Sequence, residues 1–128
     1  MAEPLGLCFA AAGSLIKWLG VSSFTLVWTH SVQHTRWEED WLLSRAGLQI
    51  VAARVEGHGA GMEPPEGAQL KSGRWHWSLT RPPQATLQLR RSDAVADWQI
   101  CQADRCQSLA AVVPAEADLV SLSVCTTE

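Results

Sequence analysis

Two short segments of the chain concentrate the residue types that do chemistry. They run from Thr29 to Glu39 and from Gly57 to Pro65, and together they hold three of the four histidines. Imidazole and carboxylate groups can bind zinc or copper, so the segments offer a candidate metal site. Its candidate ligands are His30, His34, His58, Glu39 and Glu63. The His-x3-His spacing would align two rings on a helix, but the stretch looks like a hairpin, which favours solvated histidines and no bound metal.

A hydrolytic site is a second hypothesis for the first segment. His30 precedes Ser31 directly, and Glu39 could orient a base. Neighbouring residues of a strand point to opposite faces, so His30 would not reach the Ser31 hydroxyl. The sequence also lacks the Gly-x-Ser-x-Gly elbow of many hydrolases. The pattern therefore favours a protein that is not an enzyme.

The glycines of the second segment suggest an anion site. Gly57, Gly59 and Gly61 can adopt positive φ and expose consecutive backbone N–H groups. With His30 or Arg36 nearby, such a loop would hold a carboxylate or a phosphate. It lacks the lysine and the strand–helix setting of nucleotide-binding loops. Alternating glycines are also typical of a bulged or tight connection.

Two further patterns have simpler interpretations. Glu38, Glu39 and Asp40 form an acidic run, but carboxylates of adjacent strand residues diverge, so we interpret the run as a solvated sheet edge. The chain has seven tryptophans, two phenylalanines and no tyrosine. Most of the tryptophans fall in alternating patterns, which predicts a core rich in indoles rather than a sugar-stacking platform. The candidates for such a platform are Trp28, Trp37, Trp75 and Trp77.

Alternation of apolar and polar residues recurs along the chain and predicts the elements that position these groups. It marks strands near residues 24–29, 37–43, 48–53, 75–79, 87–90, 98–100 and 120–124, and residues 5–12 read as a first strand. Glycine- and proline-containing turns separate them, and no segment of helical length competes. We therefore predict one all-β domain over residues 1–128, a small antiparallel barrel or sandwich of about eight strands.

The four cysteines predict two disulfides. Cys101 and Cys106 flank a turn-like centre, so they would face each other across a hairpin. Cys8 and Cys125 would then join the two ends of the chain. The alternative is four reduced, buried thiols. The sequence has no Cys-x2-Cys pair of the kind that binds zinc.

Composition excludes several classes of protein. The net charge is −3 and the pI about 5.8, which disfavours nucleic-acid binding because phosphate recognition needs a basic face. No apolar run reaches the roughly 18 residues of a membrane-spanning helix. No Lys or Arg precedes the apolar stretch after Leu5, so we expect a strand there and not the core of a signal peptide.

Two motifs resemble those of a bacterial family known as domain of unknown function 1850. The first is the aromatic strand that leads into Thr29-His30-Ser31-Val32, with an acidic residue, Glu39, about nine positions later. The second is Gly59-Ala60-Gly61, which follows a strand ending in polar residues. Trp98 and the Cys101–Cys106 segment look like the proteobacterial branch of the family. The resemblance covers roughly residues 6–110.

The resemblance implies an accessory protein and no established activity or cofactor. Members are often encoded beside tripartite ATP-independent periplasmic transporters that take small organic acids. This implies a periplasmic protein that binds a small organic anion or a transporter subunit, in agreement with the predicted disulfides. In that site His30, Ser31, Gly59 and Gly61 would donate hydrogen bonds, His58 and Arg36 would add positive charge, and Glu39 would orient His30 or bind a cation. Glu63 completes the set, and a purely structural partner of a membrane complex is the further alternative.

Overall fold

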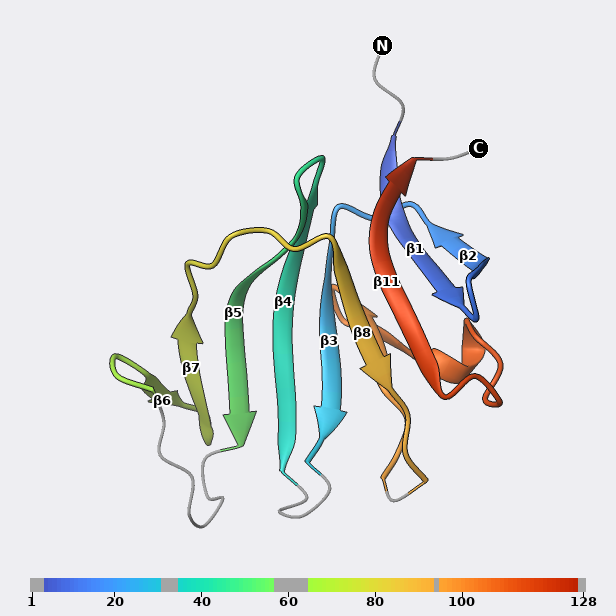
Figure 1. The fold of residues 1–128 in the computed structure, drawn as a ribbon. Coiled ribbons are helices and arrows are strands. Elements are labelled where there is room, and N and C mark those ends of the chain that lie inside the picture. Colours follow the sequence, from blue (N-terminus) through green and yellow to red (C-terminus); the bar gives the residue numbers. More distant parts are fainter. Residues whose placement is uncertain (1–3, 31–34, 57–64, 94, 127–128) are drawn as a thin grey trace.

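The chain folds into two antiparallel β-sheets that face each other (Figure 1). This computed structural model describes residues 4–30, 35–56, 65–93 and 95–126. A seven-stranded sheet has the order β10-β9-β3-β4-β5-β7-β6, and a four-stranded sheet has the order β2-β1-β11-β8. Within the described residues the strands are β1 Leu5–Ala11, β2 Ser14–Leu19, β3 Ser23–Thr29, β4 Arg36–Ser44, β5 Gly47–Glu56, β6 Gln69–Lys71, β7 Arg74–Ser78, β8 Thr86–Arg90, β9 Gln99–Gln102, β10 Arg105–Ser108 and β11 Leu119–Thr126.

The all-β prediction is confirmed, and the architecture is a sandwich and not a barrel. The described residues form eleven strands where alternation indicated about eight. The three additional strands, β2, β6 and β10, lie at sheet edges. β10 is the second flank of the predicted cysteine hairpin, whereas β2 and β6 were missed. In β2 the neighbours Leu15 and Ile16 are both exposed, so the strand has no alternating burial to detect. β6 is three exposed residues long. No helix in the described part of the chain is long and apolar enough to cross a bilayer.

The core lies between the sheets and is mostly aliphatic. β1, β8 and β11 supply one wall, and β3, β4, β5 and β9 the other. Trp41 is the only one of the seven tryptophans that is fully buried, and it stacks on Phe24 at a centroid distance of 6.5 Å. The prediction of a core rich in indoles is therefore wrong for most of them. The core residues are Leu7, Phe9, Phe24, Leu26, Trp41, Leu48, Ile50, Leu89, Ile100, Leu109, Val113, Val120 and Leu122.

Both predicted disulfides are present, so the alternative of four free thiols is wrong. Cys101 and Cys106 are cross-strand partners in the β9–β10 hairpin, with a Cα–Cα distance of 4.0 Å. Cys8 of β1 joins Cys125 of the neighbouring β11. The second bond spans 117 positions of sequence and ties the two ends of the chain within the smaller sheet.

The crossing from one sheet to the other depends on Gly47. The chain leaves β7, forms the isolated bridge between Leu48 and Gln84, and enters β8 (Figure 1). Gly47 lies beside this bridge at a φ of 128°, and a Cβ there would lie 3.0 Å from the Gln84 carbonyl carbon and closer still to its oxygen. Only glycine allows so close an approach of two backbones.

We expect Gly47→Ala to lower the free energy of unfolding by about 2 to 3 kcal/mol, because it adds both backbone strain and a clash. Gly73 is the matched control, since its φ is also positive, at 78°, but no described residue lies within 4 Å of a Cβ there. Gly73→Ala should cost about 1 kcal/mol. Urea unfolding of the two variants measures the difference, and equal losses would show that the approach to Gln84 is unimportant.

Candidate functional site

Both chemically dense segments attach to the same end of the seven-stranded sheet. β3 and β4 pair through Thr29 and Arg36, and the His30 amide donates to the Thr35 carbonyl over 2.9 Å. β5 reaches this end at Glu56, whose carboxylate accepts a hydrogen bond from the Arg36 amide. The flanks of the two segments therefore lie side by side. A site that combines residues of both segments requires this proximity.

Most of the predicted site residues lie outside the part of the chain that the structure describes. These residues are Ser31, His34, His58, Gly59, Gly61 and Glu63. Their assigned roles, and the metal set that includes three of them, stay predictions. In the described ranges, no group of three or more His, Cys, Asp or Glu side chains could hold a metal ion.

The two predicted residues of β4 lie on opposite faces of the sheet. We call the face that meets the smaller sheet the inner face and the other the outer face. Trp41 belongs to the core, so alternation puts Glu39 on the inner face with it and Arg36 on the outer face. Arg36 and Glu39 therefore cannot contact one small ligand together.

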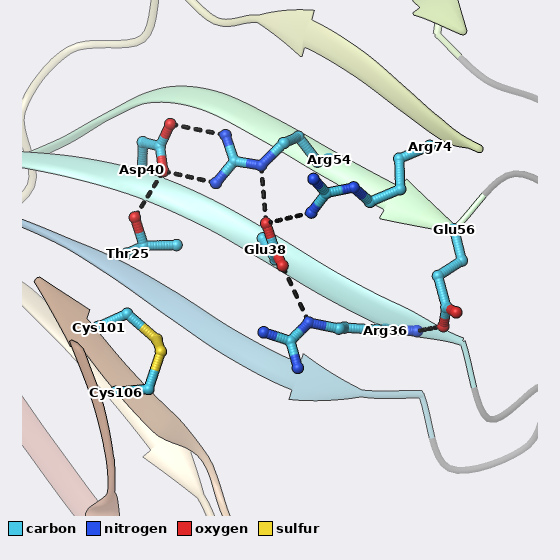
Figure 2. Close-up of polar contacts among 9 residues, drawn as sticks. All are labelled: Thr25, Arg36, Glu38, Asp40, Arg54, Glu56, Arg74, Cys101 and Cys106. Carbon is cyan, nitrogen blue, oxygen red and sulfur yellow. Dashed lines mark hydrogen bonds and ion pairs between the residues drawn. A yellow bond between two sulfur atoms is a disulfide. The ribbon is translucent and has the colours of Figure 1, made fainter. Parts of the chain in front are cut away.

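The outer face carries a network of charged side chains that we call the outer-face cluster: Arg36, Glu38, Asp40, Arg54 and Arg74 (Figure 2). Glu38 is its centre. One carboxylate oxygen accepts from Arg36 Nε at 2.9 Å, and the other accepts from Arg54 Nε at 2.8 Å and Arg74 Nη1 at 2.9 Å. Arg54 also binds Asp40 in a bidentate pair at 2.8 and 2.9 Å. Thr25 Oγ1 donates to Asp40 at 2.8 Å.

This arrangement corrects the interpretation of the acidic run. β4 is an interior strand between β3 and β5, and Glu38 is only 8% exposed, so the run is not a solvated edge. A carboxylate at such a position needs cationic partners. Arg54 and Arg74 supply them, and both were absent from the predicted site. One sequence signal could have indicated these partners: Glu38 and Asp40 alternate on one strand, and Arg54 directly follows the next predicted strand.

The arginines keep both carboxylates ionised. Burial raises the pKa of Glu38, but hydrogen bonds from Arg54 and Arg36 and the charges of Arg54 and Arg74 outweigh it, so the pKa falls below its usual value. The bond from Arg54 is the main reason that the pKa of Asp40 is also lowered. Because these folded-state pKa values are depressed, the stability they contribute is present above the unfolded pKa values, about 4, and is lost as the pH falls through the folded values.

Two of the arginines have donors left for a ligand. Arg36 and Arg74 are 45% and 38% exposed, against 18% for Arg54. A guanidinium has five N–H groups. Within the described residues, the side-chain bonds of Arg36 and Arg74 use one nitrogen each, both on Glu38. The shared carboxylate therefore holds two guanidinium groups close together at the end of the sheet where both motif segments attach.

The inner face holds a row of indoles beside Glu39. Trp28 contacts Trp98 and stacks on Trp37 at centroid distances of 5.4 and 5.8 Å, and Trp37 meets Trp77 edge-on at 6.1 Å. These rings are half-buried at the margin of the core. Glu39 is half-buried next to them and accepts from Trp41 Nε1 at 3.1 Å. Burial raises its pKa, against the opposing effects of that bond and of the Arg81 charge.

We expect Glu39→Gln to raise the melting temperature at neutral pH. The raised folded-state pKa means that ionised Glu39 destabilises the fold above that pKa, and that this cost disappears as the pH falls and the carboxyl takes up a proton. Glutamine is neutral at every pH and can still accept from Trp41. Thermal unfolding at pH 7 and pH 4 should show a gain at pH 7 that shrinks at pH 4. Glu66→Gln, at an exposed position, should change neither value, and a gain at pH 4 as large as at pH 7 would contradict the prediction.

Comparison with known protein families identifies the chain. The family described as Domain of unknown function (DUF1850) matches residues 24–109. The protein belongs to the DUF1850 family. The matched region runs from β3 to the short 3-10 helix Leu109–Ala111, so it contains the outer-face cluster and both motif segments. β1, β2 and β11 lie outside it. No curated protein and no solved structure matches the chain.

Proposed function

We propose that this DUF1850 protein is a non-enzymatic accessory protein that binds a small organic anion and works with a tripartite solute transporter for small organic acids. The main evidence for the anion site is the pair of exposed guanidinium groups of Arg36 and Arg74, which the Glu38 carboxylate holds together. Three arginines face Glu38 and Asp40, and Glu56 accepts from the Arg36 amide, so the cluster offers a ligand unused N–H donors rather than surplus positive charge.

The physical argument is preorganisation. Arginine binds carboxylates through short, charge-assisted and often bidentate hydrogen bonds. Free arginine side chains lose rotamer freedom when they bind, and Glu38 has already ordered these two. The predicted donors of the glycine segment would add to the site, because β5 delivers that segment to the same end of the sheet.

The cellular setting has separate support. A β domain with two disulfides is consistent with an extracytoplasmic location. The link to a tripartite transporter rests on the family resemblance, and we propose a periplasmic location on those two grounds.

Thermal stability in the presence of small organic acids tests the anion site, since a ligand that binds only the folded state stabilises it. At about 100 times the dissociation constant, the gain is about 2.7 kcal/mol, which is several degrees for a domain of this size. Arg36→Gln and Arg74→Gln should abolish the gain. Arg105→Gln is the matched control, because Arg105 is exposed on β10, far from the cluster in the strand order.

Three results would overturn the proposal. Organic acids that leave the melting temperature unchanged would exclude the anion site. A stoichiometric metal that is lost in His30→Ala would favour the enzyme built on His30, His34, His58 and Glu63. Co-purification with transporter subunits in the absence of any ligand effect would favour a purely structural partner.

A further inference from the structure

The outer face has a second feature, a cavity of about 340 Å³ over β5, β6 and β7. Two cross-strand relations build it. Arg54 lies opposite His76, which lies opposite Gln69. Two register positions along the same strands, Lys71 of β6 lies opposite Arg74 of β7. Of these residues, the cavity is lined by Arg54, Gln69, Lys71 and His76, and Ser78 adds a hydroxyl. Among the described residues, neither an Asp nor a Glu lines it.

The lining is suited to an anion. Lys71 and Arg54 are cations, and Gln69, Ser78 and an imidazole can each donate a hydrogen bond. Arg54 already binds Glu38 and Asp40, which offset its positive charge, so Lys71 is the main cation of the lining. Lys71 is exposed at the rim, where its ammonium can move to meet a ligand. A cation would meet Lys71 here and, among the described residues of the lining, no acidic side chain.

His76 lines the cavity and has an unused hydrogen-bonding atom. Its Nε2 atom is buried and has no hydrogen-bond partner among the described residues. A buried polar atom without a partner costs free energy, typically 1–3 kcal/mol. An anion oxygen that reaches the Nε2–H group would accept its hydrogen bond and remove that cost.

We infer that this cavity, the β5–β7 pocket, binds a compact oxyanion, a phosphate or sulfate group. Its volume lies at the lower end of the range for small-molecule sites, so it has room for a phosphoryl group with a small organic part attached. The inference goes beyond the proposed function, because the pocket uses Lys71 and His76 and does not need the exposed guanidinium groups of Arg36 and Arg74.

The test is a titration of the full, isotopically labelled chain with inorganic phosphate at fixed pH and ionic strength, followed by nuclear magnetic resonance. We expect saturable shifts of the His76 Nε2 resonance and of the β6 and β7 amides. Lys71→Ala should weaken the phosphate affinity about tenfold or more, the effect of removing one charge-assisted hydrogen bond. Lys17→Ala should leave it unchanged, because Lys17 is exposed on β2 of the other sheet.

Further variants and ligands distinguish the β5–β7 pocket from the anion site of the proposed function. Arg36→Gln should abolish binding of organic acids and leave phosphate binding intact. Loss of phosphate binding in Arg36→Gln with no loss in Lys71→Ala would overturn the inference, as would the absence of saturable shifts. A small phosphate monoester that binds more tightly than inorganic phosphate would assign the pocket to phosphorylated ligands, and the reverse order would assign it to the free ion. Lys71 is exposed, so the Lys71→Ala variant is expected to fold. The test therefore remains decisive even if His76 variants fail to fold.

Discussion

Replacing both Cys8 and Cys125 with alanine is expected to lower the free energy of unfolding by about 5 kcal/mol. The disulfide closes a loop that includes nearly the whole chain, and the chain-entropy model gives about 4.9 kcal/mol for a loop of about 118 residues. Small domains have total stabilities of only about 5–15 kcal/mol, so the variant would be close to unfolded at 37 °C. Urea unfolding under oxidising conditions measures the loss.

The second disulfide provides the matched control for this prediction. Cys101 and Cys106 are five positions apart, so the same model gives only about 2 kcal/mol for their bond. Backbone pairing of β9 with β10 also aligns positions 101 and 106, and the substitution leaves this pairing in place. A loss from the Cys101→Ala, Cys106→Ala variant that equals or exceeds the loss from the terminal pair would show that loop length does not set the contribution.

Arg54→Ala is expected to cost about 2 to 3 kcal/mol of stability at neutral pH. Arg54 makes three hydrogen bonds to two carboxylates, and its removal leaves Asp40 with Thr25 and Glu38 with the more exposed arginines. Breaking a fully buried ion pair costs about 3–5 kcal/mol and a surface pair less than about 1 kcal/mol. Because Arg54 is 18% and Asp40 34% exposed, an intermediate value is expected.

Denaturant unfolding of Arg54→Ala beside Arg105→Ala checks this value. Arg105 is exposed on the edge strand β10, and its substitution should stay within about 0.5 kcal/mol. The loss in Arg54→Ala should persist at high salt, because partly buried pairs are screened less than surface pairs. A loss that disappears in 1 M salt would mean that the cluster behaves as ordinary surface charge.

Much of the fold could be predicted because most strands have one buried face. Alternation such as Phe24, Leu26 and Trp28 reports that face directly, and the even spacing of turns indicated an all-β domain. The exposed edge strands β2 and β6 bury little, so the sequence carries no such signal for them. Whether the sheets close into a barrel depends on strand order, which alternation does not encode.

The candidate site was less predictable for a related reason. Arg36 could be selected from its neighbours in sequence, but the role of Glu38 depends on β4 being an interior strand. The partners Arg54 and Arg74 lie 16 and 36 positions away from Glu38 and meet it only through the register of three strands. A local pattern could show that carboxylates alternate on β4. It could not show which cations would face them.

The pairing of β1 with β11 also determines how the protein would respond to a mechanical load. Leu5 and Thr126 are direct partners, and Figure 1 shows the start of β1 beside the end of β11, opposite the arrowheads of β3 and β5. A pulling force applied through the two ends would pass across the covalent bond between Cys8 and Cys125, and the residues between them would carry none of it. A tether at either end would hold the molecule by the smaller sheet and leave the opposite end, where Arg36 lies, pointing away from the point of attachment.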